Sequence, residues 1–180
     1  MKPEGLVLHY LSLVFADPAN WDNPDRIWEF LHDFNLPAKK RKYGPWQGLP
    51  PGRMYGSYKW MILGDGERIQ LAPTGQETWH AGKSYFRGRE NCNKFLEGVA
   101  LVAAPQLGRD YDFTESQYRA TAELILETGF EYTTTTHEKV RREYMMRHPE
   151  DTQVKPKHDP GPTWDWSRLN QYLRYDLNGG

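Results

Sequence analysis

The sequence predicts an α/β protein of one domain, in which a central mixed β-sheet is flanked by helices. Short apolar or β-branched segments alternate along the chain with segments that have the periodicity of amphipathic helices. At 180 residues the chain is long enough to build one hydrophobic core. It has no internal repeats, and no apolar run in it is long enough to span a bilayer.

The N-terminal third is expected to hold a strand, a helix and a loop. Residues 6–10 form an apolar run and predict a buried strand. A helix is expected to begin after Asn23, because Asn is a favoured N-cap and Pro24 suits the first turn. Its apolar face consists of Ile27, Phe30, Leu31 and Phe34. Pro37 ends the helix, and residues 38–56 are a basic loop insertion rich in Gly and Pro.

The middle of the chain predicts a hairpin and a central strand. Residues 58–63 and 68–71 have strand composition, and Gly64-Asp65-Gly66 forms the turn between them. A glycine-rich, charged loop covers residues 79–88. The apolar segment 98–103 is expected to be a central strand.

The C-terminal part predicts two helices, a strand and a second insertion. Residues 114–117 have the spacing of a capping box, so a helix is expected from there to about residue 128. Residues 132–136 are rich in threonine and predict a strand. Residues 141–154 are polar and charged, which indicates a loop insertion. A terminal helix is expected over residues 164–173.

Bulk composition excludes several classes of partner. The net charge is −1, and the basic tetrad 39–42 alone is weak support for nucleic-acid or membrane binding, so neither is expected. The single Cys92 excludes an internal disulfide and fits a reducing compartment. A lone Lys2 and an apolar run interrupted by His9 do not make a convincing secretion signal. We therefore expect a cytoplasmic monomer.

Three separated residues have the pattern of a catalytic zinc site. His9 and His137 each end a predicted strand, and Asp159 precedes a Pro-Gly turn. Two imidazoles and a carboxylate, with a fourth position for water, are typical of catalytic zinc. Each residue alone is more often structural, so the pattern leaves both interpretations open. If the segment is extended, Lys157 points to the same side as Asp159 and His158 points away.

The chain resembles the zinc-dependent N-acetylmuramoyl-L-alanine amidases. The resemblance is carried by Trp79-His80-Ala81-Gly82, residues 87–93, and residues 157–162 followed by Asp165-Trp166. This family includes muropeptide-recycling amidases, short phage amidases and peptidoglycan recognition proteins. The resemblance implies an open, zinc-containing cleft. It also implies hydrolysis of the amide between N-acetylmuramic acid and L-alanine in peptidoglycan or muropeptides.

The resemblance also assigns roles to individual residues. It implies that His9, His137 and Asp159 bind Zn²⁺, and that Lys157 and Tyr58 are catalytic. Lys157 would stabilise the developing oxyanion, and Tyr58 or a water beside it would protonate the leaving amine. The expected substrate-binding residues lie in the shared motifs. They are Trp79, His80 and Asn93.

The interval from His137 to Lys157 is longer than in the recycling amidases. The comparison implies that the extra residues, about 141–154, form a flap near the cleft.

One departure from the family pattern leaves two functions open. Ala100 stands where the recycling amidases have a catalytic glutamate, and Glu97 is expected on the opposite face of its strand. An active amidase would then depend on Tyr58 and Lys157, in phage lysis or in cell-wall recycling. In phage lysis, a separate lysis protein would release the cytoplasmic enzyme to the cell wall. The alternative is a peptidoglycan-recognition protein of the same fold that binds muropeptides without cleaving them.

Overall fold

The computed structural model describes residues 2–12, 58–72, 76–103 and 113–177. The helix expected after Asn23 and the loop insertion 38–56 lie outside the described residues. In the described part, no helix is both long enough and apolar enough to cross a membrane.

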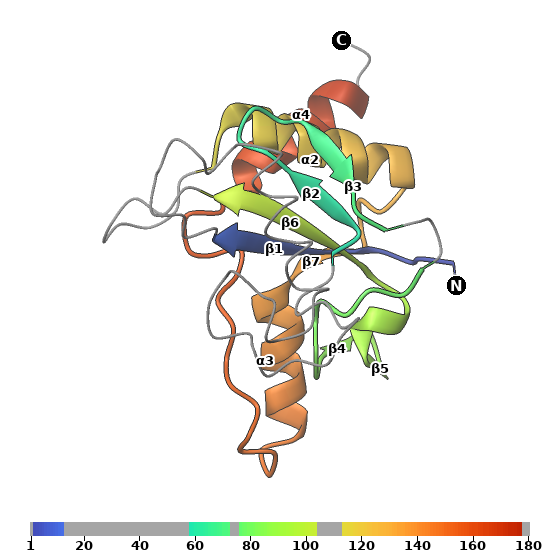
Figure 1. The fold of residues 1–180 in the computed structure, drawn as a ribbon, viewed down its shortest axis with the longest axis vertical. Helices are drawn as coiled ribbons and strands as arrows, with labels where there is room; N and C mark the ends of the chain where they lie inside the picture. The colour runs from blue at the N-terminus through green and yellow to red at the C-terminus, as the bar shows by residue number, and fades with distance from the viewer. Residues whose placement is uncertain (1, 13–57, 73–75, 104–112, 178–180) are drawn as a thin grey trace, which may run out of the picture.

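A five-stranded mixed sheet forms the centre of the molecule, in the order β3-β2-β6-β1-β7 (Figure 1). The strands are β1 (Leu6–Ser12), β2 (Trp60–Ile62), β3 (Arg68–Gln70), β6 (Glu97–Ala103) and β7 (Thr134–Thr136). Neighbouring strands are parallel except for the β2–β3 hairpin, and β1 pairs with both β6 and β7. The expected hairpin, central strand and mixed sheet are confirmed, although several strands are shorter than predicted.

Helices cover both faces of this sheet (Figure 1). The α2 helix (Glu115–Thr128) and the α4 helix (Trp166–Leu177) lie on one face, and the α3 helix (His137–Arg147) lies on the other. A two-stranded ribbon of β4 (Tyr85–Phe86) and β5 (Arg89–Glu90) lies beside α3, and a short 3₁₀ helix, Cys92–Lys94, precedes β6.

The side chains of β1 alternate between the two layers. Leu6 and Leu8 belong to the main core with α2 and α4, whereas Val7 packs in a smaller core with Val140 of α3. Because side chains alternate along a strand, His9 emerges on the α3 side of the sheet. The site therefore lies on the face opposite the main core.

The predicted capping box at the start of α2 is confirmed. The Thr114 hydroxyl accepts a hydrogen bond from the Gln117 amide, and the Gln117 side chain accepts one from the Thr114 amide. Gly129 ends the helix in the left-handed conformation, at φ 72°, which glycine adopts without steric cost.

The prediction of a loop insertion over residues 141–154 is wrong for residues 141–147. These residues continue α3, which begins at His137 and is capped by the Thr136 hydroxyl. The helix buries a narrow stripe of side chains, and the rest of its surface is charged. This stripe consists of His137, Val140 and Tyr144. So few apolar positions do not produce a recognisable helical period.

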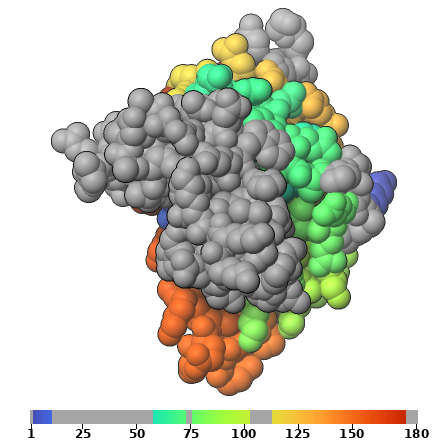
Figure 2. All heavy atoms as spheres, in the orientation of Figure 1, coloured from blue at the N-terminus to red at the C-terminus, as the bar shows by residue number. Residues whose placement is uncertain are grey.

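The segment after α3 is held against the neighbouring loop and is not a free flap. The Asp151 carboxylate pairs with Lys83 at 2.5 Å and accepts a hydrogen bond from the Tyr144 hydroxyl at 3.1 Å. His148 lies 2.8 Å from a carboxylate oxygen of Glu90 in β5. In the space-filling view this region, in orange, forms the lower end of the molecule (Figure 2).

Candidate metal centre

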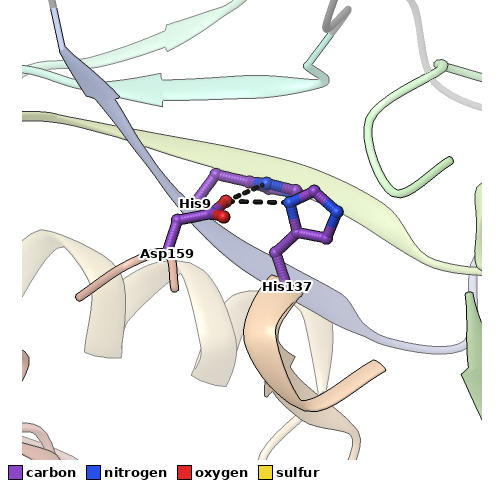
Figure 3. A group of neighbouring side chains, drawn as sticks. All are labelled: His9, His137 and Asp159. Atoms are coloured by element: carbon purple, nitrogen blue, oxygen red, sulfur yellow. Dashed lines mark hydrogen bonds and ion pairs between the residues drawn. The ribbon is translucent and has the colours of Figure 1, made fainter. Parts of the chain in front are cut away.

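The three residues expected to bind metal meet at one point, although they come from distant parts of the chain (Figure 3). Oδ2 of Asp159 lies 2.8 Å from Nδ1 of His9 and 2.9 Å from Nδ1 of His137. One ligand atom of each residue lies within 4.8 Å of those of the other two. All three residues are buried. The structure thus brings together the three residues that the sequence singled out.

Two of these side chains come from regular secondary structure, and a backbone hydrogen bond holds the segment of the third. His9 lies in β1, directly opposite Ala100 of β6 in the parallel register. His137 is the first residue of α3 and not, as expected, the end of a strand, since β7 ends at Thr136. The Asp159 carbonyl accepts a hydrogen bond from the Glu138 amide at 3.1 Å, which ties the Asp159 segment to the start of α3.

Electrostatics keeps His9 neutral and Asp159 ionised. Burial lowers the pKa of His9 to about 4, so its ring is uncharged at neutral pH. Burial alone would raise the pKa of Asp159, but the contacts with His137 and His9 outweigh it and hold that pKa well below the usual range. A neutral imidazole and a carboxylate are the forms in which these side chains bind metal.

The chemistry of the donor set tests whether a cation fits. Nδ1 of His9 and Nδ1 of His137 both face Oδ2 of Asp159, so two imidazole nitrogens and a carboxylate oxygen converge. Nε2 of His137, on the other side of its ring, lies 3.2 Å from the Ala81 carbonyl and 3.5 Å from Nη2 of Arg141. Two imidazole nitrogens and one carboxylate oxygen are a usual ligand set of catalytic zinc, so the donor set fits Zn²⁺.

A cavity of about 460 Å³ opens beside the candidate metal centre, and His137 and Asp159 are among the residues that line it. Tyr58, Trp79 and Lys157 line it, as expected from the sequence. His158, which was expected to point away, lines it as well, so the strict alternation of an extended strand does not hold there. Asp159 is the one carboxylate that the described residues contribute to the lining.

Tyr58 lies beside the first imidazole. The centres of the Tyr58 and His9 rings are 5.0 Å apart. Burial, together with the negative charge of Asp159, raises the pKa of Tyr58 well above its usual value. The phenol therefore keeps its proton at neutral pH and is available as a donor.

Two residues expected to contact substrate have other bonding partners in the structure. The Asn93 side chain is buried and does not line the cavity, and its Oδ1 accepts from the backbone amides of His80 and Ala81 at 2.9 and 2.8 Å. His80 reaches the cavity but is only 5% exposed. This geometry does not support a direct substrate contact by Asn93.

Arg141 lines the cavity and was missed in the sequence. Its Nη2 donates to the Ala81 carbonyl at 3.1 Å, the same carbonyl that faces His137. Arg141 lies four residues after His137, so both share one face of α3. Recognising residues 137–147 as a helix would have identified it.

Glu97 does not replace the missing family glutamate. Its carboxylate accepts a hydrogen bond from Trp60 Nε1 at 3.2 Å and lies 3.8 Å from Lys59 Nζ, and it does not line the cavity. Ala100 is fully buried beside His9. Any reaction at this site must therefore proceed without a carboxylate from β6.

A model of the N-acetylmuramoyl-L-alanine amidase family matches residues 1–162. The chain belongs to this family. The 1,6-anhydro-N-acetylmuramyl-L-alanine amidase AmpD of Haemophilus influenzae is 32% identical over 163 residues, which are 91% of this chain and 78% of that protein. AmpD of Citrobacter freundii is 32% identical over 111 residues, 61% of this chain and 52% of that protein. The chain thus matches about half the length of several family relatives.

Solved structures of the family share the fold. A crystal structure of a selenomethionine derivative of AmpD superposes with a TM-score of 0.62 at 26% identity, covering 96% of this chain and 86% of that one. The Escherichia coli amidase AmiD, solved as a complex with an anhydro-muropeptide substrate, has a TM-score of 0.56 at 19% identity. The superposition covers all of this chain and 65% of the AmiD chain. At 19% identity the similarity concerns the fold alone.

Proposed function

We propose that this chain is a zinc-dependent N-acetylmuramoyl-L-alanine amidase. It hydrolyses the amide bond between N-acetylmuramic acid and L-alanine in peptidoglycan fragments. The observation that carries this proposal is the convergence of His9, His137 and Asp159 beside a cavity. Two of these residues, His137 and Asp159, line that cavity together with Lys157 and Tyr58. Membership of the amidase family supports the same reaction.

The side chains around the cavity supply the groups that amide hydrolysis needs. Held by His9, His137 and Asp159, Zn²⁺ lowers the pKa of water to about 7 and acts as a Lewis acid. Lys157 places a cation in the cavity, where it stabilises the negative charge that develops on the scissile carbonyl oxygen. Tyr58 keeps its proton and is the described side chain best suited to protonate the leaving amine of L-alanine.

The named relatives favour a recycling substrate. They are 1,6-anhydro-N-acetylmuramyl-L-alanine amidases, so we propose that the chain acts on free anhydro-muropeptides in the cytoplasm. Cleavage of intact wall during phage lysis is the other setting for the same reaction.

A second candidate is supported by Ala100. Because β6 contributes no carboxylate to the cavity, the chain could hold a muropeptide without cleaving it. Such a recognition protein would keep the fold and the cavity and lack turnover.

The test is digestion of an anhydro-muropeptide and of isolated cell wall by zinc-loaded protein, with mass analysis of the products. The expected product is a free peptide that begins with L-alanine, released faster from the muropeptide than from intact wall. Binding of the muropeptide without any release of peptide would establish the recognition protein instead. The Asp159→Ala variant, which lacks a metal ligand, is the inactive control.

A further inference from the structure

His80 is buried directly behind His9, on the side away from Asp159. Its Nδ1 lies 3.0 Å from Nε2 of His9, and its Nε2 lies 2.9 Å from the backbone carbonyl of Leu96. Both ring nitrogens are therefore engaged within the protein, and the ring offers neither of them to a substrate. The two imidazoles meet nearly edge to face, with their planes at 90°.

The partners of His80 decide where its hydrogen lies. A carbonyl oxygen accepts only, so Nε2 of His80 carries the hydrogen and donates to Leu96. In the neutral ring, Nδ1 is then a bare acceptor that faces His9. This acceptor requires a hydrogen on Nε2 of His9, which leaves the lone pair of His9 on Nδ1, the atom that faces Asp159.

We propose that His80 is a positioning residue that selects the Nε2–H tautomer of His9 and thereby directs the Nδ1 lone pair of His9 into the metal site. This inference rests on the metal site of the proposed function and not on the identity of the substrate. It replaces the sequence expectation that His80 contacts substrate.

The position of the His80 ring depends on Gly98 of β6. A Cβ added at Gly98 would lie 2.6 Å from Cγ of His80, closer than two such atoms can approach. The φ angle of Gly98 is not in the left-handed region. Glycine is therefore needed at this position to leave room for the His80 ring, and not to allow an unusual backbone conformation. Gly98 admits the ring to the position from which it reaches His9.

The same dipeptide orients both metal-binding imidazoles. The His80 ring accepts from His9, and the Ala81 carbonyl lies 3.2 Å from Nε2 of His137. Oδ1 of Asn93 accepts hydrogen bonds from both backbone amides of this dipeptide and so holds its backbone in place. Residues 80 and 81 therefore present one acceptor to each imidazole, and Nδ1 of each ring faces Asp159.

Two substitutions of His80 separate this role from a merely structural one. In His80→Asn, the amide oxygen takes the place of Nδ1 and can still accept from His9, but the bond to Leu96 is lost. In His80→Gln, the amide can still donate to Leu96, but no acceptor remains where Nδ1 was. Tautomer selection predicts that Asn preserves zinc binding and Gln does not, whereas a structural anchor to Leu96 predicts the reverse order.

The readout is the zinc dissociation constant, measured by competition with a chromophoric chelator. We expect His80→Gln to bind zinc about 10–100-fold more weakly than wild type, as is usual when the hydrogen-bond partner of a metal-binding histidine is removed. His80→Asn should stay close to wild type. Equal affinities in both variants, or weaker binding in Asn than in Gln, would overturn the proposal.

A measurement on the unmutated protein covers the case in which a variant does not fold. Nitrogen-15 NMR of the zinc-loaded wild-type protein shows which ring nitrogen of His9 carries hydrogen. A hydrogen on Nε2 is expected, and a hydrogen on Nδ1 with Nε2 bound to the metal would contradict the proposal. Because neither experiment uses turnover, a protein that binds zinc but cleaves no muropeptide would refute the proposed function and leave the role of His80 intact.

Discussion

Replacing Lys157 by alanine should separate catalysis from metal binding. Lys157 lines the cavity but is not one of the three convergent residues, so the zinc content of the variant should equal that of wild type. Its side chain is exposed, so the change leaves no buried cavity, and stability should change by about 0.5 kcal/mol or less. The fold and the metal site are thus expected to survive.

The expected loss is in turnover. Removing one group that stabilises an oxyanion typically costs about 10²–10³ in kcat, or roughly 2.7–4 kcal/mol. Because Lys157 is exposed to solvent, its charge is partly screened, and a loss near 10²-fold is the better expectation. Lys157→Arg keeps the cation and should recover part of this loss.

The assay is kcat and KM on an anhydro-muropeptide, measured on protein of known zinc content. Lys155→Ala is the matched control, since Lys155 is an exposed lysine two residues earlier that does not line the cavity. We expect the control to match wild type. Wild-type turnover in zinc-loaded Lys157→Ala would remove Lys157 from the mechanism, and an equal loss in both variants would show that the effect is not specific to the site.

Three other substitutions test the remaining parts of the site. Asp159→Ala should lose both zinc and activity, whereas Asp159→Cys should keep zinc because thiolate is a good zinc ligand. Metal analysis checks both variants, and stoichiometric zinc in Asp159→Ala would refute the ligand assignment. Tyr58→Phe should lower kcat by less than Lys157→Ala if water relays the proton, and a larger loss would show that the phenol donates directly. Ala100→Glu should bring little gain in activity and lower the melting temperature, because it buries a carboxylate beside His9. A gain of orders of magnitude in that variant would identify a missing base and overturn the Tyr58–Lys157 mechanism.

The sequence by itself determined the class of fold and singled out the three residues that converge at the candidate metal centre. The capping box at Thr114 and the apolar segments around residues 6–10 and 98–103 are local signals, because hydrogen bonds and side-chain periodicity within a few residues produce them. His9, His137 and Asp159 were recognised because zinc restricts its ligands to a few side-chain types, and because the surrounding motifs resemble one family.

Only the tertiary structure decided the form of α3 and the roles of the residues around the metal centre. The helix 137–147 buries so few side chains that the periodicity of apolar residues does not predict it. Its packing against β4 and β7 holds it in place. His80 and Asn93 were assigned to substrate because their motif suggested it. Their actual partners are hydrogen-bonding atoms as far as 71 residues away, such as Nε2 of His9. Which donor meets which acceptor across such distances is set by the packing of the whole sheet and its loops, and no local pattern in the sequence records it.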